Sequence, residues 1–74
     1  MKTQKGVNVP DDFARELQKN AKALAAFEAM PPSHQREYIG AIEEAKKPET
    51  RQRRIAGAIE AILQWETERQ NRKK

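Results

Sequence analysis

The sequence predicts an all-α fold, a compact bundle of about four short helices in which the last helix is the longest. Three observations predict it. Apolar residues recur at helical spacing from Phe13 onward, apolar alternation with period two is absent, and prolines stand where helices would stop and start. A chain of 74 residues makes one domain with a small core, so a large enclosed active site is not expected.

We divide the chain into a flexible lead-in over residues 1–8, a single helical domain over 9–66 and a frayed basic tail over 67–74. The lead-in has no periodic apolar pattern, and the last residues have no apolar side chain to hold them down. No stretch approaches the roughly 18 apolar residues of a membrane span, and no secretory signal is recognisable. We therefore expect a cytoplasmic protein. The absence of cysteine excludes thiolate chemistry.

The first two helices are short and follow one another closely. Pro10 favours a helix start, and the two acidic residues after it suit the positive end of the helix dipole. A helix over about 10–18 would bury Phe13 and Leu17. Asn20 then fits the N-cap of a second helix, whose apolar residues again recur at helical spacing.

Prolines delimit the third and fourth helices. The pair at positions 31 and 32 ends the second helix, and Ser33 is the expected N-cap of the third. An inward stripe would run from His34 through Tyr38 and Ile42. Pro48 fits the first position of the fourth helix, which would continue into the late 60s. The predicted core consists of Phe13, Leu17, Leu24, Phe27, Tyr38, Ile42, Ile55, Ile59 and Ile62.

The grouping of the only serine, histidine and tyrosine could suggest catalysis. However, Ser33 and His34 are adjacent at a helix start and point in different directions, and no acid is evidently placed to orient the imidazole. An enzyme would need His34, Tyr38 and a carboxylate to converge on a cleft. One histidine with scattered carboxylates also makes no recognisable metal site. We therefore predict no catalytic, metal or cofactor site.

Positive charge gathers in the second half of the chain. The net charge of +4 divides into +2 over 1–10, −3 over 11–45 and +5 over 46–74. We expect Arg51 to have a structural role, crossing back to a carboxylate such as Glu44 or to the carbonyls that end the third helix. The candidate interaction surface consists of Lys46, Lys47, Arg53 and Arg54.

Two glycines lie on the predicted outward faces of the third and fourth helices. Gly40 and Gly57 each disfavour a helix by up to about 1 kcal/mol relative to alanine. They could permit a partner or a second copy to approach, with Trp65 as an apolar anchor beside the interface. The alternative is that glycine is simply tolerated on a solvated face.

The stretches "VPDDFARELQKNAKALAAFEAM" and "MPPSHQREYIGAIEEAKKPETRQRRIAGAIEAI" resemble the bacteriocin-protection, YdeI/OmpD-associated family, a family of bacterial proteins. The resemblance covers about positions 8–63 and implies a compact helical module, which family members often carry at the C-terminal end of a longer chain. The sequence departs from the family pattern at Ala41, where an aromatic residue is common, and at Gly57, where a basic residue is common. The family name implies envelope defence against antimicrobial peptides, a role that we do not carry over to this chain, which is itself cationic.

We therefore expect a non-enzymatic interaction or accessory module that acts through its surface on a protein partner. The alternative is weak, sequence-independent nucleic-acid binding through the basic turn at 46–54 and the basic tail. Self-association is a further option. A protein interface and a nucleic-acid interface differ in their response to salt, because only phosphate contacts release counterions in proportion to the charges neutralised.

Overall fold

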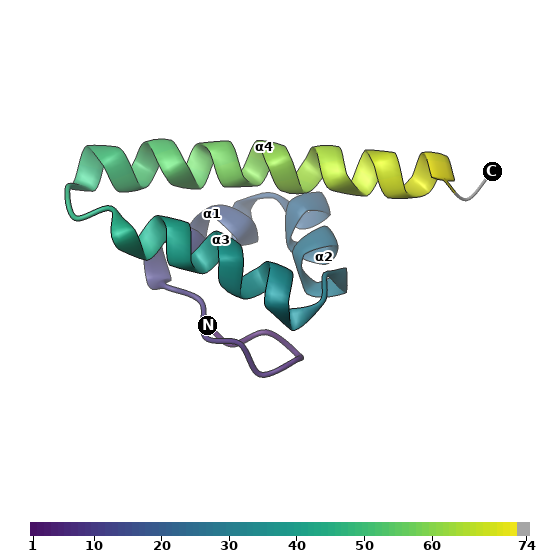
Figure 1. The fold of residues 1–74 in the computed structure, drawn as a ribbon, viewed down its shortest axis with the longest axis horizontal. Helices are drawn as coiled ribbons and strands as arrows, with labels where there is room; N and C mark the ends of the chain where they lie inside the picture. The colour runs from purple at the N-terminus through teal and green to yellow at the C-terminus, as the bar shows by residue number, and fades with distance from the viewer. Residues whose placement is uncertain (73–74) are drawn as a thin grey trace.

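The structure is a computed structural model that describes residues 1–72. Within these residues the chain forms four α-helices and no β-strand, which confirms the predicted all-α bundle (Figure 1). No helix in this part of the chain is long and apolar enough to cross a membrane. The helices are α1 (Asp11–Lys19), α2 (Ala21–Ala29), α3 (Pro32–Glu44) and α4 (Pro48–Arg72).

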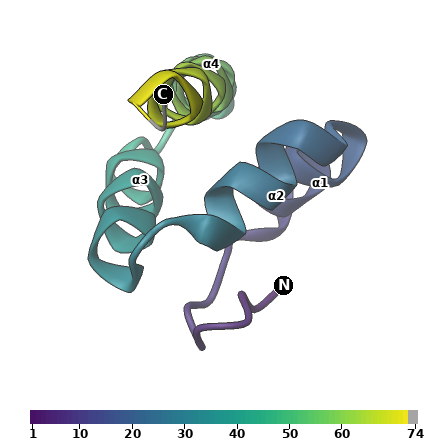
Figure 2. The ribbon, with the colours of Figure 1, turned by 90° about the vertical axis from the view of Figure 1, so that its right-hand side faces the viewer.

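The longest helix, α4, is the element against which the three shorter helices pack. At 1.5 Å per residue its 25 residues extend about 37 Å, and the molecule is 42 Å long. Figure 1 shows α1, α2 and α3 gathered along one side of α4, while the C-terminal end of α4 continues beyond them. Seen along α4, α3 lies on one side and α1 and α2 lie on the other (Figure 2). The core fills the space between them.

The core is built around two phenylalanines. Phe13 and Phe27 are fully buried and contact each other edge to face, with ring centroids 5.3 Å apart. Six of the nine predicted core residues are buried. The other three are partly buried and pack against the same cluster: Leu24, Tyr38 and Ile59. Helical periodicity therefore identified the apolar faces of the helices, and the small core leaves its edges partly open to solvent.

The start of α3 differs from the prediction. Pro31 occupies the N-cap position with an extended backbone, and Pro32 is the first helical residue. Proline suits that position because its fixed φ fits the helix and its missing N–H would be unpaired there anyway. Ser33 consequently lies inside the first turn, and no side chain caps this helix. The prediction that Ser33 is the N-cap is wrong, whereas Asn20 does cap α2 by accepting a hydrogen bond from the Ala23 N–H at 3.1 Å.

The inward face of α3 is rotated from the predicted stripe. Gln35, Ile39 and Ile42 are buried, whereas His34 is exposed and Tyr38 is only half-buried. The prediction placed His34 at the head of an inward stripe because it assumed that a buried position would be apolar or aromatic. A fully buried glutamine at the next position overturns that assumption.

Residues 1–9 fold back and pack on the helices. The Val9 N–H donates to the Met1 carbonyl at 2.7 Å, the Thr3 N–H donates to the Val7 carbonyl at 2.8 Å, and both valines are buried. Gly6 makes the turn with a φ of +87°, a conformation that side chains with a Cβ rarely adopt. Thr3, Val7 and Val9 are buried in this arrangement, although the segment has no periodic apolar pattern. Backbone hydrogen bonds and two buried valines hold the loop in place. Neither produces a periodic apolar pattern, so the sequence did not indicate that this segment packs on the helices.

The predicted tail over 67–74 falls on the end of α4. The helix continues to Arg72, and residues 73 and 74 lie outside the described part of the chain. Within this end, Arg69 donates to the Glu66 carboxylate at 3.0 and 3.1 Å and also lies 5.2 Å from the centroid of the Trp65 ring. Pairs three and four residues apart stabilise a helix even where it has no neighbour.

Gln35 joins three segments through its buried amide. Its Nε2 donates to the Phe27 carbonyl at 2.8 Å, at the end of α2. Its Oε1 accepts from the Thr3 hydroxyl at 3.1 Å, and that hydroxyl accepts from the Val7 N–H at 3.1 Å. Because a buried polar group is stable only when it is hydrogen bonded, this amide fixes the loop, α2 and α3 relative to one another.

We predict that Gln35→Met lowers the free energy of unfolding by about 1–3 kcal/mol, because the thioether keeps the length of the side chain but leaves the Thr3 hydroxyl without its acceptor. Urea unfolding would measure the change. The matched control is Gln64→Met on the exposed side of α4, expected to lie within about 0.5 kcal/mol of the parent. Equal stabilities for the two variants would contradict the role assigned to the amide.

Candidate functional site

Arg51, in the first turn of α4, connects three helices. Its Nε and Nη2 donate to the two carboxylate oxygens of Asp12 at 2.8 and 3.1 Å. Its Nη1 donates to the carbonyls of Ile42 and Ala45 at 3.2 and 3.4 Å. The expected bonds to the carbonyls at the end of α3 are therefore present. The carboxylate partner, however, is Asp12 on α1 rather than Glu44, because α1 lies beside the start of α4.

The pairing changes the ionisation of both groups. The hydrogen bonds from Arg51 hold the pKa of the Asp12 carboxyl below its ordinary value, against the opposing effect of partial burial, and the Phe13 N–H at 2.9 Å adds to the lowering. The same pair raises the pKa of Arg51. Both groups are thus charged at neutral pH, and a planar guanidinium with two parallel donors suits a carboxylate well.

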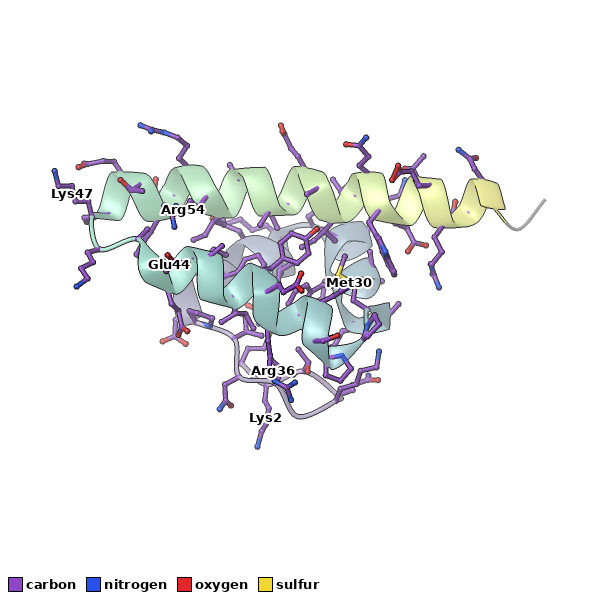
Figure 3. All side chains as sticks on the ribbon, in the orientation of Figure 1. Lys2, Met30, Arg36, Glu44, Lys47 and Arg54 are labelled. Atoms are coloured by element: carbon purple, nitrogen blue, oxygen red, sulfur yellow. The ribbon has the colours of Figure 1, made fainter. Side chains whose placement is uncertain are left out.

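The four basic residues of the candidate interaction surface come from two neighbouring parts of the chain, the connection between α3 and α4 and the second turn of α4. All four are exposed. Lys46 and Lys47 lie in the connection between α3 and α4, and Figure 3 places Lys47 at the end of the molecule. Arg54 lies between α4 and α3, where its Nη1 donates to the Ala41 carbonyl at 2.6 Å. This contact ties α3 to α4 and gives Arg54 a structural partner.

Of the serine, histidine and tyrosine of α3, His34 and Tyr38 line one hollow and Ser33 does not. Ser33 and His34 are exposed, and Tyr38 packs edge to face on Phe27 with centroids 6.5 Å apart. Burial raises the pKa of the Tyr38 hydroxyl, and the nearby Glu37 carboxylate raises it further. His34, Glu37 and Tyr38 do line one hollow, but no side-chain hydrogen bond joins any two of them within the described chain. A raised pKa also makes the phenol a poorer general acid or nucleophile at neutral pH.

A groove runs between α3 and α4, which we name the α3–α4 groove. It consists of two adjoining hollows of about 440 and 340 Å³ that share Tyr38 and Ala41. The first, the Trp65 hollow, is lined by Met30, His34, Glu37, Tyr38, Ala41 and Trp65. The second, the Gly57 hollow, is lined by Tyr38, Ala41, Ile42, Arg54, Gly57 and Ala58. Small side chains therefore open the groove, and aromatic side chains border it.

The two positions that depart from the family pattern, Ala41 and Gly57, both line the α3–α4 groove. A Cβ added at Gly57 would meet nothing within 4 Å, and the same is true at Gly40. Neither glycine is therefore required by helix packing within the described residues. Trp65 is half-buried at the other end of the groove and packs against the core.

A second groove, of about 550 Å³, lies between α1 and α4. Ile55 and Ile59 supply its apolar part, and charged residues of α1 border it. Three of these charged residues already have partners, since Lys19 pairs with Glu16 at 3.2 Å and Asp12 pairs with Arg51 at 2.8 Å. Sequence reasoning missed this groove because Ile59 was assigned to the core.

The described residues contain no group of three histidine, cysteine or acidic side chains that could hold a metal ion. The hollows are open to solvent, and both hydrogen-bonding and apolar side chains line them. The fold and these surfaces define a class of protein, a small helical domain whose distinctive features are grooves on either side of its longest helix.

The comparison with family models is more specific. Residues 6–64 match the model of the family described as Bacteriocin-protection, YdeI or OmpD-Associated. The match covers most of the chain, so the protein belongs to this family, as the resemblance in its proline-bounded helices indicated. No curated protein and no solved structure shows significant similarity to the chain.

We predict that the Asp12–Arg51 pair makes stability depend on acid pH. Because the pKa of Asp12 is lower in the folded chain than its ordinary value of 3.8, its contribution is fully present above that value. The contribution is lost as the pH falls through the lower folded pKa. Asp12→Asn removes it, so the stability of this variant should decline less steeply below about pH 4 than that of the parent.

The matched control is Asp11→Asn, since both aspartates lie in the first turn of α1 and both interact with the helix dipole. Urea unfolding at a series of pH values would measure the three proteins. Asp11→Asn should keep the acid dependence of the parent. If the two variants gave the same pH profile, Arg51 would not distinguish Asp12 from an ordinary carboxylate at a helix start.

Proposed function

We propose that this protein is a non-enzymatic, cytoplasmic interaction module that binds a segment of a partner protein in the α3–α4 groove. The observation that carries the proposal is the continuity of the groove, in which two hollows share Tyr38 and Ala41 and lie between helices that Arg54 ties together. A rigid groove with apolar walls and a few charged groups at its rim is the usual form of a peptide-binding surface.

The sizes of the side chains support the same proposal. Within the described residues no large hydrophobic side chain is exposed, so the surface offers hollows instead of protruding anchors. The partner would then supply the large side chain, and the positions at Ala41 and Gly57 leave room for it. Anchor residues that fill a pocket contribute most of the affinity of many interfaces.

The groove can be tested with peptides selected from a random displayed library on the immobilised protein. We predict that Gly57→Trp weakens binding of the selected peptides at least about tenfold, a loss equivalent to 1.4 kcal/mol, because the indole occupies the hollow that the bound side chain needs. Calorimetry or fluorescence anisotropy would measure the affinities. Gly57→Ala is the matched control, since its Cβ meets no neighbour and alanine favours the helix.

Gly57→Ala should bind as the parent does. Failure to select any peptide, or selected peptides that bind Gly57→Trp and the parent equally, would contradict the proposal. Titration with mixed-sequence DNA and RNA provides the other comparison. Amide shifts localised at Lys46, Lys47, Arg53 and Arg54, with an affinity that falls steeply as salt rises, would replace the proposal with the nucleic-acid alternative.

A further inference from the structure

The Trp65 hollow has a different chemistry from the rest of the surface. Glu37 is the only acid that lines it, and no lysine or arginine does so, although the chain as a whole carries a net charge of +4. By contrast, the α1–α4 groove is lined by two acids and two bases. Glu37 is therefore the one acidic side chain among the residues that line the Trp65 hollow, which also include His34.

The aromatic residues of the hollow add to this preference for positive charge. Tyr38 and Trp65 both line it, and the faces of phenol and indole rings attract cations. The structure already contains one such contact, because the Arg69 guanidinium lies 5.2 Å from the centroid of the Trp65 ring. Trp65 thus already contacts one guanidinium, that of Arg69, which pairs with Glu66 and is not among the residues that line the hollow.

The carboxylate in the hollow has no partner of its own. Glu37 is exposed, and its carboxylate makes no ion pair or hydrogen bond with the described residues. Its negative charge reaches the hollow, since Glu37 adds to the rise in the pKa of Tyr38 that burial causes. By comparison, Asp12, Glu16 and Glu66 are each paired with a base.

We propose that the Trp65 hollow binds one cationic side chain, an arginine or a lysine, of the partner polypeptide. The inference rests on the proposed function and deepens it, because it names the chemistry of the residue that the α3–α4 groove selects. The carboxylate of Glu37 pairs with the charged group, and the rings of Tyr38 and Trp65 contact its flat or alkyl part. A volume of about 440 Å³ has room for a long side chain of this kind.

Arginine fits the hollow better than lysine. A guanidinium is planar, stacks on aromatic rings and presents parallel donors to a carboxylate, whereas an ammonium is compact and more strongly hydrated. Met30 at the inner side of the hollow offers an apolar contact to the methylene groups of either residue. Tyr38 also continues into the Gly57 hollow, so the residues that flank the cation in the partner can contact the rest of the groove.

The test uses N-acetyl-arginine amide and N-acetyl-citrulline amide as probes. Citrulline has the same length and a planar end group but no charge. Two-dimensional NMR of the labelled protein would follow the Trp65 indole N–H and the amides of Glu37 and Tyr38, with sodium chloride at matched concentrations as the ionic-strength control. We expect localised shifts with the arginine probe and no comparable shifts with the citrulline probe.

A pair of matched variants tests the role of the carboxylate. Glu37→Gln keeps the size of the side chain and should weaken binding of the arginine probe about threefold to fivefold, as expected for the loss of an exposed ion pair. Glu44→Gln changes another exposed acid of α3 that lies outside the hollow, and it should bind as the parent does. Both positions are exposed, so neither variant should disturb folding.

Equal shifts with both probes, or equal binding by Glu37→Gln and the parent, would overturn the cation site. The peptide selection separates this failure from failure of the proposed function. Peptides that depend on Gly57 but lack a basic residue would overturn the cation site and leave the binding groove in place. Selected peptides in which an arginine is common, and whose binding weakens in Glu37→Gln, would support both.

Discussion

The structure depends on the guanidinium of Arg51, which joins the starts of α1 and α4 to the end of α3. Two donors engage Asp12 and a third nitrogen reaches the last carbonyls of α3, so one planar group fixes the meeting point of three helices. One turn later Arg54 adds a second tie, to the Ala41 carbonyl. These two arginines hold α3 beside α4 at the end where the helices are connected. The helices therefore enclose the α3–α4 groove without needing a large core to fix their separation.

A small core explains why polar groups carry so much of the architecture. Short chains bury a smaller fraction of their surface than long ones, and their apolar contacts alone leave little stability. Gln35 supplements those contacts from inside, since its amide connects the loop, α2 and α3 where an apolar side chain would contact them without fixing their orientation. Lys5 does the same at the surface by donating to the carbonyls of Glu28 and Met30 at the end of α2. Both connections are specific in direction, which apolar packing is not.

Local signals predicted the helices and missed the contacts between distant residues. Proline at position 48 and the cap at Asn20 act within a few residues, so the sequence indicates them directly. The pairing of Arg51 with Asp12 spans 39 positions, and nothing nearby distinguishes Asp12 from Asp11, because both suit the helix dipole. Serine is a common N-cap residue, so the sequence favours Ser33 as the cap of α3. In the structure Pro31 occupies the N-cap position and the helix begins at Pro32. The α3–α4 groove could not be predicted from the sequence for a related reason. Ala41 and Gly57 were recognisable as small, but only the relative position of α3 and α4 brings them together.

The distribution of charge adds a constraint on what the groove can select. The net charge of +4 repels cations at long range, whereas Glu37 and the aromatic rings attract them only within the Trp65 hollow. A strongly basic partner would be attracted at the hollow and repelled by the net positive charge of the rest of the surface. A segment with a single basic residue among neutral or acidic neighbours would be attracted at both places. Its basic residue would pair with Glu37 in the hollow, and its acidic residues would be attracted by the exposed side chains of Lys46, Lys47 and Arg53. The proposed site is thus selective for the placement of one cation, rather than for positive charge in general, because a single carboxylate lines the Trp65 hollow while the chain carries a net charge of +4.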